Sequence, residues 1–587
     1  MKKGVWIWYP GDYEVWLARE AGCRRYYRDT IVPPEWRVDG CYSIVAFCRH
    51  FELSADDVLT IKALGKMNIS LDHKQITGFQ GTLPVSKGKH YFEIRVYNPS
   101  GVPSVCVDGR ELQTDAQWSA MYGWEQANSK VSVGCGKKPV GIKFKKSAVK
   151  AEKIAADEDV YDFGVETMGY ITFSAAGKGE AKIFYGESLE ECLDTAECEL
   201  TDTVKVSKTK KYTTPLAKAF RYVKLECSDG VTIENVAGVS EFLPLVNKAG
   251  FDFGDGLLNE IYRVSERTLH LTMREFFLDG IKRDRWAWGG DAYQSYLMNY
   301  YTFNDLEIVK RTMLALAGKP PYNRHINRIP SYTFFWLMGF AEYYERTGDA
   351  DFCSRFFDRA AAFMEFCVSR TNQRGLIVDH PEDWMYVDWA DGLDDSGEVA
   401  YNNILYYAAL KKFSELCAVF DKPEEEKYAR LAEKVLETVM NVFWCEERQC
   451  FFYNAKDKDK AGPCIKRQPN IMAVLFDAVS EEKQKAIIQN VLLNDKIDKI
   501  TTPYMRFFEL DALAKTGRIK YVISEIKSYW GGMLAEGATS FWEAYDPRQN
   551  NAEHYAMYGR KYGKSLCHAW GAAPLYLLGR YAEKILR

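Results

Sequence analysis

The first 250 residues alternate apolar and polar positions in short segments, which is the pattern of β-strands with one buried face. Gly- and Pro-containing turns separate the segments. Antiparallel strands at this spacing predict two β-sandwiches. The clearest segments are 59–63, 69–72 and 92–96 in the first set, and 161–164, 170–173, 181–185 and 220–225 in the second.

The period changes near Gly254, after which apolar residues recur every three or four positions, as on one face of a helix. Turn signals such as Gly348 and Pro423 bound the apolar stripes, so we expect helical hairpins rather than one long rod. A long run of hairpins without a fixed-period repeat favours a closed toroid over a solenoid. The clearest stripes cover residues 257–271, 356–367, 406–420 and 428–442.

These patterns predict three domains, namely an N-terminal β-sandwich over 1–135, a second β-sandwich over 136–250 and a helical domain over 251–587. A basic segment from Lys137 to Lys153 opens the second domain. Phe144 is its one aromatic residue, which favours a solvated linker over a phosphate-binding patch. The net charge of -4 provides no general field for nucleic acid or an anionic membrane, so we expect neither as a partner.

The 15 cysteines contain no CxxC pair and no Cys/His spacing typical of zinc sites, and their odd number argues against a disulfide framework. We expect them to be small core residues in a reducing compartment. The charged N-terminus begins like a signal peptide, but Tyr9-Pro10-Gly11-Asp12 interrupts its apolar run. This predicts a cytoplasmic location, and a periplasmic or secreted one if a leader has been removed.

Carboxylates and tryptophans occur together in three stretches of the helical part, and a fourth stretch adds a histidine. Acids and bases bond the hydroxyl groups of a neutral sugar ring, while aromatic faces cover its C–H surface. Loops on one rim of a toroid converge over its centre, so we expect these stretches to form one sugar-processing site. The stretches are 277–291, 380–392, 536–547 and 565–571.

Each candidate residue also has a purely structural explanation. The first stretch is equally well explained as a Gly-rich turn with solvated charges, in which Asp279 forms the turn. Asp388 can cap a helix, Glu543 can be half of a salt bridge, and His568 can be a core histidine. The recurrence of tryptophan beside carboxylate in three separate segments favours a site.

The residues from Asp279 to Asp291, Asp-Gly-Ile-Lys-Arg-Asp-Arg-Trp-Ala-Trp-Gly-Gly-Asp, resemble a motif of the bacterial α-L-rhamnosidases, glycoside hydrolase family 78. Gly537-Ala-Thr-Ser-Phe-Trp-Glu543 resembles that family's Gly-Ala-Thr-Thr-x-Trp-Glu, and Ser565-Leu-Cys-His568 resembles its Ser-Leu-Asn-His. The three motifs stand in the family's order. Together with strand segments upstream, the resemblance covers roughly residues 155–587.

The resemblance implies N-terminal β-sandwiches followed by a six-hairpin (α/α)6 barrel, and hydrolysis of terminal α-L-rhamnose in a carbohydrate substrate with inversion. It requires no cofactor and no metal. Carried over by position, the general acid is Asp284 and the general base is Glu543, on opposite faces of the scissile bond. The candidate substrate-binding residues, taken from the motifs and the tryptophan-carboxylate stretches, are Asp279, Arg283, Trp288, Asp291, Asp388, Trp389, Trp542 and His568.

Two features depart from the family pattern. The family usually has Glu at the position of Asp284, so this shorter acid must sit on a closer backbone or act through water. The chain also ends at Arg587, where many members continue into another β-domain. Three alternatives stay open, namely an inverting barrel enzyme of other sugar specificity, a catalytically impaired rhamnose-binding protein and a helical scaffold. A homodimer is also compatible with the sequence.

Overall fold

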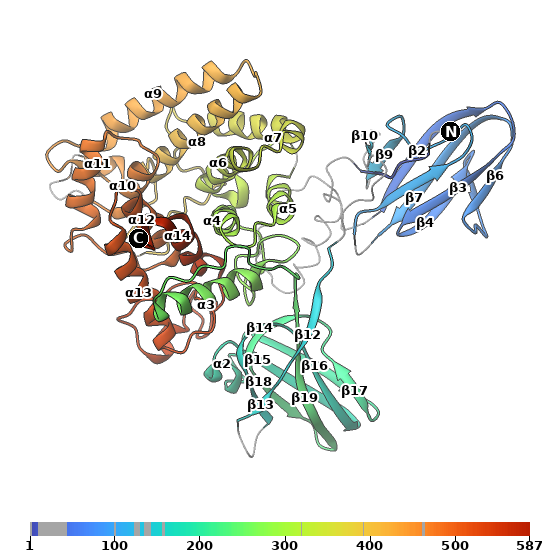
Figure 1. The fold of residues 1–587 in the computed structure, drawn as a ribbon, viewed down its shortest axis with the longest axis horizontal. Helices are drawn as coiled ribbons and strands as arrows, with labels where there is room; N and C mark the ends of the chain where they lie inside the picture. The colour runs from blue at the N-terminus through green and yellow to red at the C-terminus, as the bar shows by residue number, and fades with distance from the viewer. Residues whose placement is uncertain are drawn as a thin grey trace. The chain divides into compact units, whose positions relative to one another are not determined.

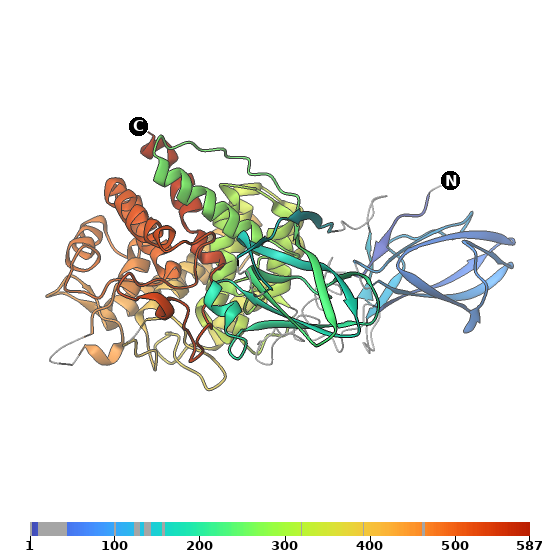
Figure 2. The ribbon, with the colours of Figure 1, turned by 90° about the horizontal axis from the view of Figure 1, so that it is seen from below.

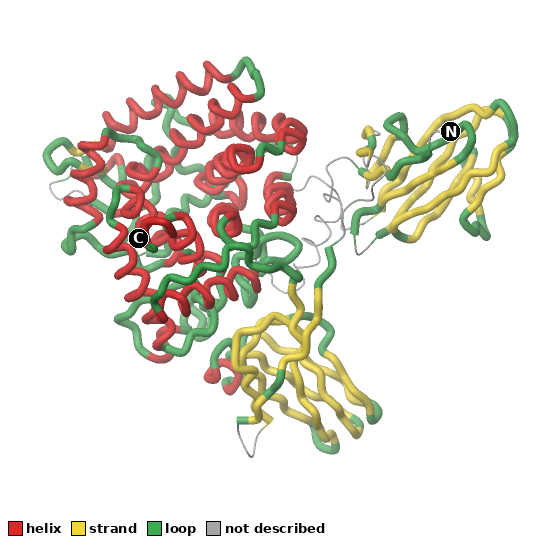
Figure 3. Tube along the Cα trace, in the orientation of Figure 1, coloured by secondary structure: helices red, strands yellow, loops and turns green. Residues whose placement is uncertain are grey.

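The structure is a computed structural model of the 587-residue chain. It forms two compact units, residues 1–143 with 317–319, and residues 144–316 with 320–587. Figure 3 shows strands in the first unit, and strands followed by helices in the second. The described residues are 3–9, 44–98, 101–122, 129–133, 142–154, 159–318, 320–390, 392–458, 460 and 464–586.

The first unit is a β-sandwich of two antiparallel sheets, with strand orders β11-β1-β8-β3-β6 and β10-β9-β2-β7-β4-β5 (Figure 1). Alternate residues of both sheets, such as Ile61 and Ile94, are buried in one shared core. This confirms the sandwich that the alternating pattern predicts. The strands are β1 (Ile7–Trp8), β2 (Ile44–Leu53), β3 (Asp57–Leu64), β4 (Lys66–Leu71), β5 (Lys74–Ile76), β6 (Thr82–Val85), β7 (Gly88–Tyr97), β8 (Ser104–Asp108), β9 (Ser119–Tyr122), β10 (Ser129–Lys130) and β11 (Ser132–Val133).

The second set of strands forms an antiparallel sheet of order β12-β19-β14-β18-β15-β16, in which β13 and β17 also pair with β14. The predicted segments 161–164 and 170–173 join into one long strand, β14, whose register shifts between Asp162 and Thr167. The elements are β12 (Lys145–Val149), β13 (Glu152–Lys153), β14 (Asp159–Gly177), β15 (Gly179–Gly186), α2 (Leu189–Leu193), β16 (Leu200–Val206), β17 (Lys210–Thr213), β18 (Lys218–Cys227) and β19 (Val231–Phe242).

The helical part contains an inner ring of six helices, in which each helix packs against the next and the last packs against the first. Helices enclosed on all sides are expected to be apolar or buried all round rather than on one stripe. In agreement, α4 is buried from Gly289 to Asn299. The ring consists of α4 (Gly289–Tyr300), α6 (Pro330–Thr347), α8 (Ala400–Val419), α10 (Arg467–Leu475), α12 (Pro503–Lys515) and α14 (Pro574–Arg580).

One outer helix precedes each inner helix along the chain, which gives the predicted six hairpins. The outer helix α9 buries much of the stripe predicted over 428–442, although Ala432 and Phe443 are buried in place of their neighbours Leu431 and Val442. The first outer helix, α3, lies beside the C-terminal helices α13 and α14, so the two ends of the helical part meet (Figure 2). The outer helices are α3 (Gly256–Thr272), α5 (Leu306–Ala317), α7 (Ala350–Ser369), α9 (Glu425–Phe443), α11 (Glu481–Ile487) and α13 (Ile519–Ala535).

The structure confirms the helix end that the sequence predicts at Gly348. Helix α6 ends at Thr347, and the following Gly348 takes the left-handed conformation, with φ of 64°, that the stop signal predicts. Residues 10–12, which interrupt the apolar run of the N-terminus, and the start of the basic segment, 137–141, lie outside the described residues. The bounds of the three domains stay predictions. Within the described residues, no helix is long and apolar enough to cross a membrane.

A buried ion cluster attaches the second sandwich to the barrel. The Lys282 ammonium lies 3.2 Å from Glu187 Oε2 and 3.1 Å from Glu191 Oε2, and it donates a hydrogen bond of 2.9 Å to the carbonyl oxygen of Tyr562. All three ionisable side chains are almost completely buried. Because charges in such a place must be paired, the cluster holds the first barrel loop against the sandwich.

We expect Lys282→Met to lower the free energy of unfolding by about 3–5 kcal/mol, because it leaves two buried carboxylates without their cation. Denaturant unfolding of both proteins at neutral pH measures the loss. The loss should shrink at acidic pH, where protonation neutralises Glu191, because burial raises the pKa of Glu191 to about 7. Lys561→Met is the control, since Lys561 pairs with Asp194 of the same sandwich on the exposed surface and should matter little. Equal unfolding of Lys282→Met and wild type would contradict this role.

Candidate active site

The first barrel loop, residues 273–288 between α3 and α4, is joined to the last segments of the chain by backbone hydrogen bonds. Ala569 N donates to the carbonyl oxygen of Asp279 over 2.6 Å, and Ile281 N donates to that of Cys567 over 3.3 Å. Gly280 and His568 form a β-bridge. Segments from the two ends of the helical part therefore lie side by side and share one site.

Asp279 organises this loop with its carboxylate. Its Oδ2 accepts a hydrogen bond of 2.8 Å from Asp284 N, and its Oδ1 accepts one of 2.9 Å from Trp286 N. The side chain is buried. Burial raises the pKa of Asp279 to about 7, and the neighbouring charge of Asp284 acts in the same direction. Asp279 thus shapes the turn, as its structural explanation predicts. Its carboxyl group also belongs to the candidate site.

Glu543 lies on the segment that follows α13, and its side chain is only 3% exposed. Arg283 Nη2 donates to both of its oxygens, over 2.9 and 2.7 Å. Tyr558 Oη donates to Oε1 over 2.7 Å and Ser565 N donates to Oε2 over 2.9 Å. Burial by itself raises the pKa of Glu543, but the charge of Arg283 and these hydrogen bonds outweigh it and lower that pKa. Glu543 is therefore a carboxylate at neutral pH.

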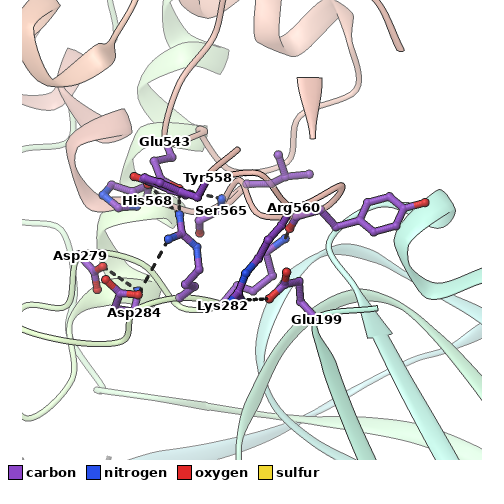
Figure 4. A network of polar contacts seen from close by, with 12 residues as sticks. Glu199, Asp279, Lys282, Asp284, Glu543, Tyr558, Arg560, Ser565 and His568 are labelled. Atoms are coloured by element: carbon purple, nitrogen blue, oxygen red, sulfur yellow. Dashed lines mark hydrogen bonds and ion pairs between the residues drawn. The ribbon is translucent and has the colours of Figure 1, made fainter. Parts of the chain in front are cut away.

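Arg283 connects the two candidate catalytic carboxyls. Its Nη1 lies 3.9 Å from Asp284 Oδ1, while its Nη2 binds Glu543, and its guanidinium group stacks on the Tyr558 ring with its carbon 4.2 Å from the ring centre. Asp284 is the more accessible acid, with a side chain that is 26% exposed. Figure 4 shows Asp279 and Asp284 on one side of the site and Glu543, Tyr558 and His568 on the other.

Asp291 and His568 form a buried pair, with His568 Nε2 3.1 Å from Asp291 Oδ1. Burial raises the pKa of Asp291. Burial also acts to lower the pKa of His568, but the bond to Asp291 and the charge of Glu543 overcome this and raise that pKa. His568 Nδ1 has no hydrogen-bond partner within the described part of the chain. His568 is therefore a buried histidine with one ring nitrogen paired and the other without a partner among the described residues, and its substrate-binding role stays a prediction.

Aromatic side chains of the stretch 380–392 form a surface that extends toward the candidate catalytic carboxylates. Trp389 stands edge-on to Tyr558 with ring centres 5.0 Å apart, and it contacts Trp384 at 5.6 Å. Trp384 contacts Trp288 at 6.4 Å and is 42% exposed, so its ring is open to a ligand. The predicted Trp288 and Trp389 thus lie in one aromatic surface beside Glu543.

Sequence reasoning did not identify Tyr558 or Trp384 as site residues. Trp384 lies in a stretch already marked by its tryptophans and carboxylates, so a fuller use of that signal finds it. Tyr558 belongs to no motif. It reaches Glu543 from the long connection after the Trp-Glu motif, and only the folded chain places it there.

Two predicted residues have other neighbours. Asp388 is buried, and its oxygens accept hydrogen bonds from Gln468 Nε2, Thr502 Oγ1 and Trp389 N, so it holds the backbone of Trp389. Burial raises the pKa of Asp388 to about 6. The Trp542 side chain packs against Tyr545 and His554 and lines a separate cavity. Their substrate-binding roles stay predictions.

The arrangement combines a partly exposed acid, an ionised buried carboxylate and an aromatic surface. These are the groups that acid–base cleavage of a neutral sugar acetal needs. Among the residues that the structure describes, no group of three or more His, Cys, Asp or Glu side chains is arranged to hold a metal ion.

Two protein-family models match the chain. The model described as the bacterial alpha-L-rhamnosidase 6 hairpin glycosidase domain matches residues 247–582, which is more than half of the chain. The model of the alpha-rhamnosidase-like N-terminal domain of the bacteroidetes matches residues 45–132 and 137–225. No curated protein matches the chain.

Solved structures of similar fold include several rhamnosidases. A rhamnosidase from Klebsiella oxytoca with rhamnose bound is 21% identical, with a TM-score of 0.65, over 75% of this chain and 96% of that one. A family 78 rhamnosidase of Bacillus sp. GL1 is 22% identical, with a TM-score of 0.64, over 91% of this chain and 66% of that one. An α-L-rhamnosidase of Streptomyces avermitilis complexed with L-rhamnose is 13% identical, with a TM-score of 0.59, over 92% and 61%. This chain thus spans about two thirds of the Bacillus enzyme and less of the Streptomyces one.

Proposed function

We propose that this chain, which belongs to the bacterial α-L-rhamnosidase family of glycoside hydrolases, releases terminal α-L-rhamnose by an inverting acid–base mechanism. The observation that carries the proposal is the pairing of ionised, buried Glu543 with the more exposed Asp284 across one guanidinium group. The rhamnose held by the Klebsiella and Streptomyces enzymes supports the choice of sugar.

The separation of the two carboxyls is compatible with inversion. Since the terminal nitrogens of a guanidinium are about 2.3 Å apart, the nearest oxygens of Asp284 and Glu543 are at most about 9 Å apart. Inverting glycosidases separate their carboxyls by roughly 6.5–9.5 Å, which leaves room for the attacking water.

Asp284 acts as the general acid in this proposal. It gives its proton to the glycosidic oxygen as that oxygen leaves the anomeric carbon. The family's usual glutamate is longer by one methylene, so the backbone of Asp284 must stand close to the sugar. The hydrogen bond from Asp284 N to the Asp279 carboxyl supports this, because it fixes the backbone at the position from which the short side chain reaches out.

Glu543 acts as the general base and takes a proton from water on the opposite face of the anomeric carbon. Its lowered pKa keeps it ionised over a wide range of pH. A carboxylate offers about four lone-pair positions, and Arg283, Tyr558 and Ser565 N already use them. The water therefore replaces one of these donors, and Tyr558, on an exposed loop, is the one that moves most easily.

The buried polar residues bind the ring. Asp279 and Asp291 accept or donate hydrogen bonds to sugar hydroxyl groups, according to their protonation, and His568 donates one. Trp288 and Trp389 cover the apolar face of the ring. A homodimer and a cytoplasmic location stay predictions from the sequence.

We expect Glu543→Gln and Asp284→Asn each to lower the turnover of an aryl α-L-rhamnoside by at least about a hundredfold, the usual size of lost acid–base catalysis. Steady-state hydrolysis rates measure the effect. Asp546→Asn is the control, because Asp546 follows Glu543 closely but pairs with Arg548 at the surface. Near-normal rates in both catalytic variants would refute the assignment.

The variant Tyr558→Phe tests whether the hydrogen bond from Tyr558 helps to keep Glu543 ionised. The hydrogen bond from Tyr558 lowers the pKa of Glu543, so its loss should raise that pKa. Since the base works only when ionised, the acidic limb of the pH profile of kcat/KM should move to higher pH. Tyr562→Phe, which removes a hydroxyl near Asp194 instead, should leave the limb in place. An unmoved limb in Tyr558→Phe would show that this bond does not tune the base.

A further inference from the structure

A second cavity, of about 330 Å³, lies between the second β-sandwich and the barrel. Its barrel wall includes residues 536–540 and Trp542, directly before Glu543, together with Tyr555 and Leu566. Glu543 itself is not part of the lining. The sandwich contributes Glu166, Glu187 and Arg221. The cavity is therefore separate from the candidate active site, although one motif supplies residues to both.

The bulge in β14 directs Glu166 into this interface. Gly164 has φ of 77°, a left-handed conformation that interrupts the strand, and Glu166 follows two residues later. Glu166 N then donates to Thr539 Oγ1 of the barrel segment over 2.9 Å. The bulge and this bond to a barrel side chain thus fix the backbone of Glu166 at the interface.

Two buried carboxyl groups at this cavity have unused hydrogen-bonding capacity. Glu166 and Glu187 are 2% and 4% exposed, and Oε1 of each has no hydrogen-bond partner within the described residues. Glu187 Oε2 is already used by Leu566 N at 2.5 Å and by Lys282 at 3.2 Å. Buried polar atoms without a partner cost free energy, so this pair marks a place for a ligand that hydrogen-bonds.

The chemistry of the lining selects the ligand class. Burial and the charge of Glu187 raise the pKa of Glu166 well above its ordinary value, so Glu166 is uncharged and can both donate and accept. The other three glutamates, 187, 190 and 536, outnumber the one cation of the lining, Arg221, and disfavour an anion. Three aromatic side chains, Tyr222, Trp542 and Tyr555, complete the wall and offer flat apolar surface.

We propose that this cavity is a second carbohydrate site, which binds one neutral pyranose ring beside Trp542 and holds its hydroxyl groups with Glu166 and Glu187. The volume lies at the small end of ligand pockets, as suits a single sugar unit. The proposal does not depend on the catalytic roles of Asp284 and Glu543. It gives Trp542 of the Trp-Glu motif a ligand other than the sugar that is cleaved.

The test uses the full chain labelled with fluorotryptophan, whose Trp542 resonance is assigned by its loss in Trp542→Phe. L-Rhamnose, D-galactose and D-glucose are titrated in turn and followed by fluorine NMR. We expect at least one sugar to shift the Trp542 resonance saturably. Glu166→Ala should weaken this binding about tenfold, as expected for a lost buried hydrogen bond, and should leave the rhamnose-dependent shifts of Trp288 and Trp389 unchanged.

Glu166→Gln is the matched variant, because its amide keeps a neutral donor and acceptor of the same size and should retain the binding. A Trp542 resonance that none of the three sugars moves would overturn the proposal, as would a shift that persists fully in Glu166→Ala. A response to the protonated amine of D-glucosamine that Glu166→Gln abolishes would identify a cation site instead. Hydrolysis of an aryl α-L-rhamnoside by the same variants reports separately on the catalytic mechanism.

Discussion

The ion pair between Arg283 and Glu543 is the interaction on which this molecule depends most. It links the first loop of the barrel to the last segments of the chain, where backbone hydrogen bonds between Asp279 and Ala569 and a bridge between Gly280 and His568 close the ring. Buried charges of this kind must be paired to be tolerated. The proposed catalytic pair can therefore form only in the closed barrel, which explains how residues so distant in the sequence come together.

The same environment gives similar carboxyl groups different properties. Burial raises the pKa of Asp279 and Asp291, whereas the charge of Arg283 lowers that of Glu543. Carboxyl groups of one site thus differ in how readily they ionise, which is what the proposed acid–base mechanism requires. The second sandwich contributes to this arrangement through its ion pairs with Lys282, because Lys282 directly precedes Arg283 in the chain.

The sequence predicts the architecture well, because apolar periods of two and of three to four residues report directly which faces are buried. Its motifs also indicate Asp279, Arg283 and Glu543, whose chemistry is unusual enough to stand out. The motifs do not show which way each side chain points in the folded chain. Trp542 and Glu543 are neighbours in one motif, yet one lines a separate cavity and the other binds Arg283. Tyr558 could not be predicted, since only tertiary folding places its loop at Glu543.

The most direct test of the mechanism is the anomeric form of the first sugar released. In an inverting reaction, water activated by Glu543 attacks opposite the leaving oxygen, so an α-L-rhamnoside gives β-L-rhamnose before mutarotation. Proton NMR spectra recorded from the first moments of hydrolysis distinguish the two anomers. We expect β-L-rhamnose to appear first and the α anomer to follow by mutarotation. If α-L-rhamnose were the first product, it would contradict the two-carboxylate mechanism.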